Sequence, residues 1–154
     1  MDIILQSLAM VYYLIFPAQQ YNDQGNQLMA NIVQLQKNKN YAECIKLIDQ
    51  AIIHHNRCLI DQRSPGVISC MRENASLLWF CRAECHYSLE RYDESLSDCE
   101  NALDLNANNC NVYYLKAFIH EQLGDEKMSM ACMILAAQNG HRKAKELVIA
   151  NRIS

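Results

Sequence analysis

Glycine and proline are scarce in this sequence, whose 154 residues include four glycines and two prolines. Because these residues mark the tight turns of β-rich proteins, their scarcity favours helices joined by short turns. A disordered chain is not expected either, since 51% of the residues are hydrophobic and only 20% are charged. The length is that of one domain with a sizeable core.

The chain also lacks an excess of positive charge and any recognisable catalytic motif. Its formal net charge is −3 at pH 7, so nucleic acid is not expected as a partner. No nucleophile–base pair, phosphate-binding loop or catalytic pair of carboxylates stands out. We therefore expect a protein that is not an enzyme and needs no cofactor.

Cysteine, by contrast, is abundant, with eight residues. In a small secreted chain this number would indicate disulfides. Five of the cysteines instead fall within helical patterns: Cys44, Cys81, Cys85, Cys99 and Cys132. We expect them to be reduced and to serve as small apolar residues of a cytoplasmic protein.

A metal site is not expected around these cysteines. Cys81 and Cys85 share one face of a helix, but no second pair of ligands accompanies them, as structural zinc sites require. The neighbouring His86 points about 100° away from Cys85 on a helix, so both cannot easily bind one ion.

Residues 1–16 are almost wholly apolar. Asp2 stands where a signal peptide has a basic residue, and the segment is shorter than the ~20 residues that a membrane-crossing helix needs. We expect a buried helix that ends at Pro17 and packs on the rest of the chain. An interfacial anchor and the remnant of a longer chain are the alternatives, and a membrane partner is not expected.

A 34-residue repeat organises the second half of the chain. Trp79 recurs as Tyr113 and Ala83 recurs as Ala117. The same spacing joins further pairs: Leu89 and Leu123, Ser95 and Ser129, Cys99 and Met133, Ala102 and Ala136. In each unit the apolar residues form two helical stripes around a short turn, Glu90-Arg91 or Gly124-Asp125. Turns this short predict antiparallel helix pairs.

This order of aromatic and small residues resembles the tetratricopeptide-repeat family, whose period is 34 residues. The resemblance implies an all-α, right-handed α-α superhelix of three helix-turn-helix repeats, with an N-terminal apolar helix and a C-terminal capping helix. The chain then divides into the N-terminal helix (1–20), a repeat array (21–140) and the capping helix (141–154). Within the array lie repeat 1 (21–56), an insertion (57–73), repeat 2 (74–108) and repeat 3 (109–140).

Two further expectations concern the helix surfaces. In the capping helix Ala144, Leu147, Val148 and Ile149 are expected to face inward and cover the end of the array. The acidic residues of the middle unit are expected to be solvated: Glu90, Asp93, Glu94, Asp98 and Asp104.

The resemblance also implies a concave groove lined by the first helix of each repeat. The expected function is a non-catalytic protein–protein interaction module, an adaptor or co-chaperone-like scaffold that binds a peptide or helix, chaperone-related partners included. The groove-facing residues would be Met29, Val33, Phe80, Cys81, Glu84, Tyr87, Asn111, Tyr114, Leu115 and Phe118. Trp79, Ala83, Tyr113 and Ala117 would occupy core positions of the same helices. The alternative is a repeat segment of a larger chaperone-linked, ubiquitin-ligase or membrane-tethered protein.

The middle unit resembles co-chaperone repeats that bind the acidic tails of heat-shock chaperones through a carboxylate clamp of Lys, Arg and Asn side chains. The five clamp positions fall here on Met29, Val33, Cys81, Asn111 and Leu115, and none keeps the clamp residue. Asn26 could take part only if the first helix is shifted. Tail binding is therefore not expected, because each missing charged hydrogen bond would cost about 1.5–3 kcal/mol.

Overall fold

The computed structural model describes residues 30–31, 34–35, 37–60 and 65–151. The expected N-terminal helix at 1–20, Asn26, Met29 and Val33 lie outside the described residues. The main helices are α3 (Tyr41–Ile60), α4 (Pro65–Ser88), α5 (Tyr92–Leu105), α6 (Cys110–Gln122), α7 (Glu126–Gln138) and α8 (Arg142–Asn151). No strand occurs within the described ranges. The expected all-α solenoid is confirmed.

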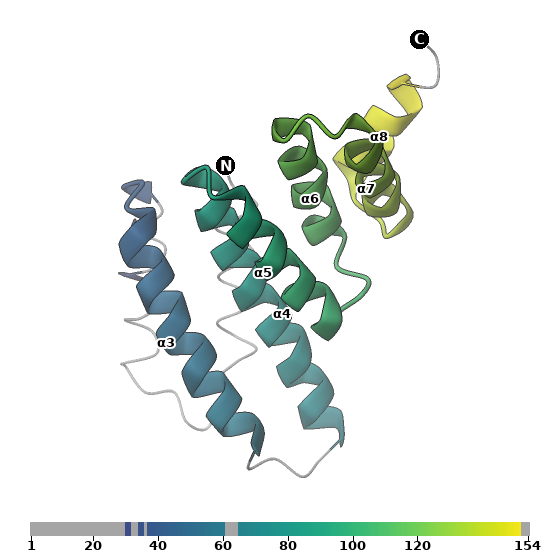
Figure 1. The fold of residues 1–154 in the computed structure, drawn as a ribbon. Coiled ribbons are helices and arrows are strands. Elements are labelled where there is room, and N and C mark those ends of the chain that lie inside the picture. The colour runs from purple at the N-terminus through teal and green to yellow at the C-terminus, as the bar shows by residue number, and fades with distance from the viewer. Residues whose placement is uncertain (1–29, 32–33, 36, 61–64, 152–154) are drawn as a thin grey trace.

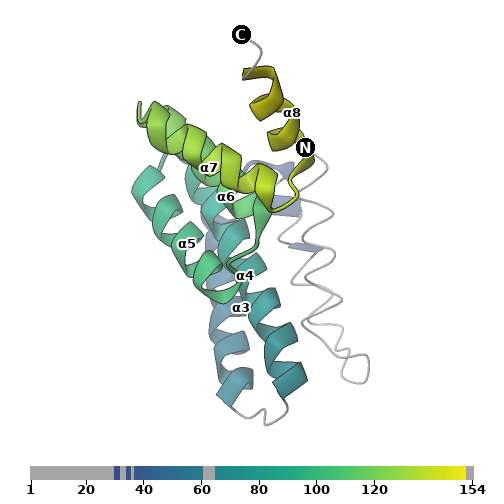
Figure 2. The ribbon, with the colours of Figure 1, turned by 90° about the vertical axis from the view of Figure 1, so that its right-hand side faces the viewer.

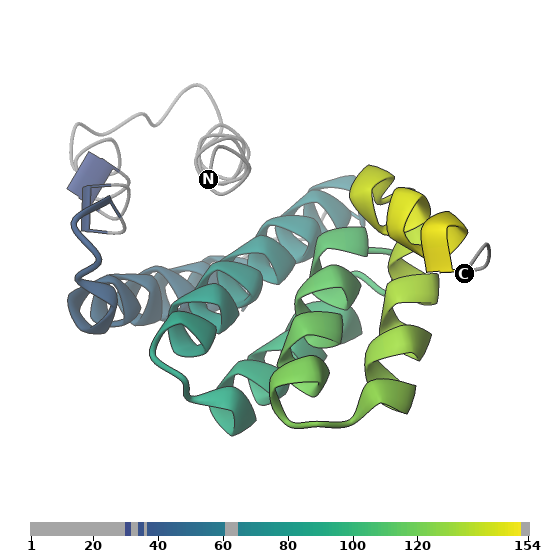
Figure 3. The ribbon, with the colours of Figure 1, turned by 90° about the horizontal axis from the view of Figure 1, so that it is seen from above.

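The helices follow one another along the array, and each packs against its neighbour in sequence (Figure 1). α4 pairs with α5, and α6 pairs with α7, as the two predicted turns require. α3 packs on α4, and α8 packs on α7 at the C-terminal end (Figure 2). Seen from above, the succession runs from α3 to α8 (Figure 3). α4 and α6, the first helices of consecutive pairs, also contact each other directly.

Each turn after α4, α6 and α7 contains one residue in the left-handed conformation. These residues are Glu90 (φ 59°), Gly124 (φ 77°) and Gly140 (φ 99°). The turns lie where the sequence predicts them. Glycine adopts positive φ without steric cost, whereas a side chain with a Cβ atom does not, so Glu90 is the strained member of the three.

The predicted insertion at 57–73 is largely helical. α3 continues to Ile60, and α4 already begins at Pro65. Proline suits the first position of a helix, where its missing N–H has no partner to lose. The extra residues therefore lengthen α3 to 20 residues and α4 to 24, against 14 in α5 and 13 in α6.

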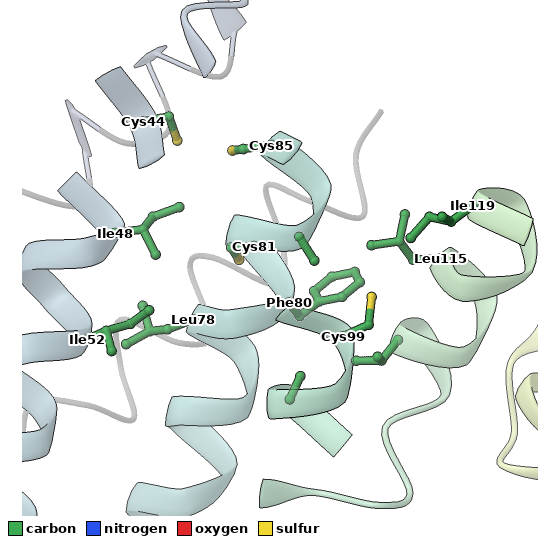
Figure 4. Packing of buried hydrophobic residues seen from close by; sticks show 13 residues of the cluster. Cys44, Ile48, Ile52, Leu78, Phe80, Cys81, Cys85, Cys99, Leu115 and Ile119 are labelled. Atoms are coloured by element: carbon green, nitrogen blue, oxygen red, sulfur yellow. The ribbon is translucent and has the colours of Figure 1, made fainter. Parts of the chain in front are cut away.

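The main core cluster is built around α4. Its buried members are Cys44, Ile48 and Ile52 on α3, Leu78, Phe80, Cys81, Ala83 and Cys85 on α4, Cys99 and Ala102 on α5, and Val112, Leu115 and Ile119 on α6. In Figure 4, Cys81 and Cys85 lie toward α3, whereas Phe80 lies toward Cys99 and Leu115. α4 is thus enclosed by neighbours on opposite sides.

The second core cluster lies at the C-terminal end and is small. Its buried members are three alanines, Ala136, Ala137 and Ala144, with partly buried side chains of α6, α7 and α8 around them. On α8, Ala144 and Val148 pack inward as expected. The same expectation is wrong for Leu147 and Ile149, which are 47% and 60% exposed. A single helix can turn only one stripe of about 100° toward the array, and Ala144 and Val148 fill it.

Candidate functional site

The predicted groove residues divide between the core and the surface. Phe80, Cys81 and Leu115 are buried in the main core cluster, with exposures of 3%, 0% and 8%. Their predicted place on the groove surface is therefore wrong. The prediction assumed that each first helix has one buried face and one exposed groove face. α4 instead packs against helices on two sides and buries residues on both sides.

The remaining five described residues are partly exposed on the first helices of the two pairs. We call them the first-helix face: Glu84 and Tyr87 on α4, and Asn111, Tyr114 and Phe118 on α6. Spacings of three, four or seven residues keep each set on one side of its helix. The two helices contact each other, so both sets belong to one region of the array.

Aromatic rings pack against one another along α6. Tyr114 meets Phe118 edge-on, with ring centroids 4.8 Å apart, and stacks on His141 at 3.9 Å. Such pairs contribute about 0.5–1.5 kcal/mol beyond the area they bury. The stacked His141 also accepts a hydrogen bond at Nδ1 from the backbone N–H of Ala144, at 3.2 Å. This end of the face is therefore fixed by the start of α8.

Tyr87 lies at the other end of the face. Its ring is 5.9 Å from that of Tyr92 at the start of α5. Burial raises the pKa of Tyr87, and the nearby Tyr92 and Glu121 raise it further. The influence of Glu121, on the last turn of α6, shows that the C-terminal ends of α4 and α6 lie close enough to interact electrostatically.

Glu84 lies one helical turn before Tyr87 on α4. Its Oε2 atom is buried and has no hydrogen-bond partner. Burial raises the pKa of the Glu84 carboxyl to about 8. The ionised form is disfavoured because no cation offsets its lost hydration. A buried carboxyl without a partner is uncommon and calls for an explanation.

Asp98 is a second buried carboxyl, and its position corrects the expectation that it is solvated. It is 3% exposed and accepts two hydrogen bonds from Arg82, from Nε at 2.9 Å and from Nη2 at 2.6 Å. The third nitrogen of Arg82 bonds Asp49 on α3, and the guanidinium lies 4.4 Å from the centre of the Trp79 ring. Arg82 therefore joins α3, α4 and α5. The other acidic residues expected in solvent (Glu90, Asp93, Glu94 and Asp104) are exposed.

Sequence reasoning missed this pair, although a signal exists. In an antiparallel helix pair, residues at equal distances from the turn face each other. Arg82 and Asp98 lie symmetrically about Glu90, eight residues to each side. Ser95 is a further contact between the two helices, because its hydroxyl donates to the carbonyl of Ala83 at 2.7 Å.

The chemical groups near this face do not form a recognisable catalytic set. Burial raises the pKa of the Cys81 thiol well above its ordinary value and that of Cys99 to about 12, so both remain protonated and poorly nucleophilic at neutral pH. His86 has its Nε2 atom 3.8 Å from Asp98 and a buried Nδ1 without a hydrogen-bond partner. Burial lowers its pKa.

The described residues contain neither a cluster of metal ligands nor a membrane-crossing helix. No group of three or more His, Cys, Asp or Glu side chains converges there as metal ligands would. Equally, none of the described helices combines the length and apolar character that crossing a membrane requires. The six cysteines whose side chains are described are all thiols, and five of them are buried.

The comparisons with known proteins agree with this helical architecture. A family model of the tetratricopeptide repeat matches residues 76–109, which cover the second half of α4, all of α5 and the turn that follows. A comparison with curated proteins finds no match. Among solved structures, the chain resembles the crystal structure of PcrH in complex with the chaperone binding region of PopB. The TM-score is 0.61 at 16% sequence identity, over 86% of this chain and 97% of that chain. At this identity the likeness concerns the fold alone.

Proposed function

This chain is a tetratricopeptide-repeat protein, and from that premise we propose that it is a non-catalytic interaction module whose first-helix face binds a segment of another protein. The observation that carries the proposal is the row of partly exposed aromatic rings on α4 and α6: Tyr87, Tyr114 and Phe118. Aromatic side chains are enriched at binding hot spots because they bury much area at low entropic cost.

Phe118 is the most informative of the three. It belongs to neither core cluster, although it contacts Tyr114. An aromatic ring that stays partly exposed among the described helices is available for a partner. We further propose an adaptor or co-chaperone-like role, in which an apolar peptide or helix of the partner covers these rings.

PcrH, the structural relative, is solved with the chaperone binding region of PopB, so an array of this fold binds a protein segment there. An acidic chaperone tail is not the proposed ligand here. Two of the described clamp positions, Cys81 and Leu115, are buried apolar residues, and the third is the uncharged Asn111.

The test is an affinity pull-down from a cytosolic extract with the full chain as bait. Three baits are compared: the wild type, Phe118→Ala, and the control Leu147→Ala, which removes an exposed apolar side chain from α8. Loss of a hot-spot aromatic ring costs about 2 kcal/mol or more, which is roughly a thirtyfold loss of affinity.

The proposal expects a partner that is retained by the wild type and Leu147→Ala and lost from Phe118→Ala. Thermal denaturation establishes that both variants are folded. Equal retention by all three baits would place binding on another surface, and the absence of any specific partner would contradict the proposal.

A further inference from the structure

The two buried carboxyls of the middle helix pair differ in one respect. Asp98 is satisfied within the chain by two hydrogen bonds from Arg82. Glu84, only two residues from Arg82, has a buried Oε2 atom with no hydrogen-bond partner. Leaving a buried polar atom unpaired is destabilising, because the atom loses its hydration and gains no hydrogen bond in return. Because Glu84 lies on the first-helix face, a bound partner could supply the missing donor.

The chain's own cations near Glu84 are engaged elsewhere. Arg82 bonds Asp98 and Asp49, and the Nζ atom of Lys116 on α6 lies 3.8 Å from Glu100 on α5. No nearby cation lowers the pKa of Glu84, whose only resolved perturbation is burial. A second carboxylate that acts on this face is the exposed Glu121, which raises the pKa of Tyr87. The region therefore combines a carboxyl that lacks a hydrogen-bond donor with aromatic rings.

We propose that the partner segment carries a lysine or arginine among apolar residues, and that this cation pairs with Glu84 while the apolar residues pack on Tyr87, Tyr114 and Phe118. The inference rests on the proposed function and names the chemistry of its partner. Charge complementarity supports it, because a buried carboxylate is best satisfied by a hydrogen-bonding cation. Aromatic rings beside the carboxyl would add cation–π attraction.

Pairing with a cation would change the protonation state of Glu84. At pH 7 the carboxyl of the unbound chain is mostly protonated, because its pKa is about 8. A bound cation favours the carboxylate, so the proton leaves to solvent when the segment binds. Below pH 8 this deprotonation opposes binding, and affinity therefore rises with pH, by at most tenfold per pH unit for one proton.

The groups around Glu84 do not share this titration. Cys81 on α4 and Cys99 on α5 interact with it electrostatically, but burial raises their own pKa values far above neutrality. Burial likewise raises the pKa of Tyr87, and the pKa of His86 is lowered by burial. Proton release between pH 7 and 8 would thus report on Glu84.

The first experiment selects peptides from a displayed random library of 12-residue sequences on the full chain at pH 8. The inference expects apolar consensus sequences with a lysine or arginine at a fixed position. Apolar consensus sequences without a cation would overturn it and leave the proposed function intact. If no peptide is selected, both the proposed function and this inference fail.

The second experiment measures the consensus peptide by titration calorimetry in two buffers that differ in ionisation enthalpy. At pH 7, where the Glu84 carboxyl of the unbound chain is mostly protonated, the wild-type chain should release close to one proton for each peptide bound. Glu84→Gln keeps the size of the side chain but cannot ionise, so proton release should vanish and affinity at pH 8 should fall about tenfold, as expected for one lost charged hydrogen bond.

The matched control is Glu126→Gln, which neutralises an exposed carboxylate on α7. This variant should keep both the affinity and the proton release of the wild type. Replacing the peptide's cation by norleucine should remove proton release with the wild-type chain. Unchanged affinity and proton release in Glu84→Gln would overturn the inference, whereas thermal denaturation establishes that the variant is folded.

Discussion

The middle helix pair, α4 with α5, and the last pair, α6 with α7, follow one 34-residue pattern but are stabilised differently. The middle pair has helices on both sides and contributes seven residues to the main core cluster. It also contains the Arg82–Asp98 ion pair. Among the described helices, the short α8 covers the outer side of the last pair, and the buried members of the cluster there are three alanines.

The turn and capping residues, by contrast, are more favourable in the last pair than in the middle pair. The middle pair turns at Glu90, a non-glycine residue at positive φ. Arg91, the N-cap residue before α5, makes no side-chain capping hydrogen bond. The last pair turns at Gly124, and Asp125 caps α7 by accepting a hydrogen bond from the backbone N–H of Met128, at 3.0 Å. Tertiary packing thus compensates for poor turn chemistry in the middle pair, and good turn chemistry supports the weakly packed last pair.

The largest expected effect comes from removing the cation of the middle pair. Arg82→Leu leaves the buried Asp98 without its two hydrogen bonds and should lower the free energy of unfolding by about 3 kcal/mol, as broken buried ion pairs do. The measurement is chemical denaturation with urea. Arg72→Leu on the same helix is the control, since Arg72 is exposed and donates to the backbone carbonyl of Asp104. A loss no larger than that of Arg72→Leu would contradict the role assigned to Arg82.

Larger side chains at two equivalent buried positions allow the packing of the two helix pairs to be compared. Ala83 and Ala117 are both 0% exposed, and Ser95 shows how closely α5 approaches the first of them. Ala83→Leu and Ala117→Leu should each lower the free energy of unfolding by about 1–3 kcal/mol. The enclosed middle pair should lose more than the open last pair. Unchanged thermal unfolding in both variants would refute the helix assignment.

The order of helices and turns could be predicted from the sequence because those signals are local. The 34-residue repetition of Trp79, Ala83 and Leu89 places the helix pairs, and the Gly124-Asp125 turn and Gly140 lie where the chain bends. These signals depend on side-chain type and spacing alone. They therefore predict the helices and turns correctly even when the tertiary contacts between helices are unknown.

The candidate site could be predicted only in part. The exposure of a side chain depends on how many helices pack around its own helix, and the repeat pattern does not give that number. Phe80 and Leu115 match groove positions but lie between α4, α5 and α6. Asp98 matches a solvated helix position but faces Arg82. In contrast, Tyr114 and Phe118 remain partly exposed, although Tyr114 packs against the small C-terminal cluster.

Helix capping should matter in the last pair and not in the middle one. Asp125→Ala removes the cap of α7 and should cost about 1 kcal/mol, whereas Arg91→Ala should cost little, because Arg91 makes no such bond. Arg91→Asp should instead gain up to about 1 kcal/mol by adding the missing cap. Urea denaturation of the three variants measures this. Equal losses in the two alanine variants would remove the distinction between the pairs.

Substitutions at the turn residues should change the free energy of unfolding by less than the loss of the α7 cap does. Glu90→Gly relieves a side chain at positive φ and should stabilise the chain by about 0.5–1 kcal/mol. Gly124→Ala should destabilise it by a similar amount. A Cβ atom at Gly124 would meet no atom within 4 Å, so its cost is conformational alone. Differential scanning calorimetry gives both values, and a destabilising Glu90→Gly would show that the glutamate side chain has a role of its own.

The smallest effect concerns the cap of α8 and depends on pH. Burial, and secondarily the positive charge of Lys143, lowers the pKa of His141. The hydrogen bond from the N–H of Ala144 requires an unprotonated Nδ1 atom. A lowered pKa in the folded state means that this stability is fully present above the ordinary histidine pKa of about 6.5 and is lost as pH falls through the lowered value.

Amide hydrogen exchange across residues 142–151, compared between pH 7.5 and pH 5, checks this, because it reports on α8 separately from His86, whose pKa is also lowered. After correction for the intrinsic pH dependence of exchange, protection of α8 should fall at the lower pH while that of α4 changes less. His141→Asn keeps a capping acceptor that does not titrate, so the pH dependence of α8 protection should disappear. Its persistence in that variant would assign the effect to another group and leave His141 as a packing residue for Tyr114.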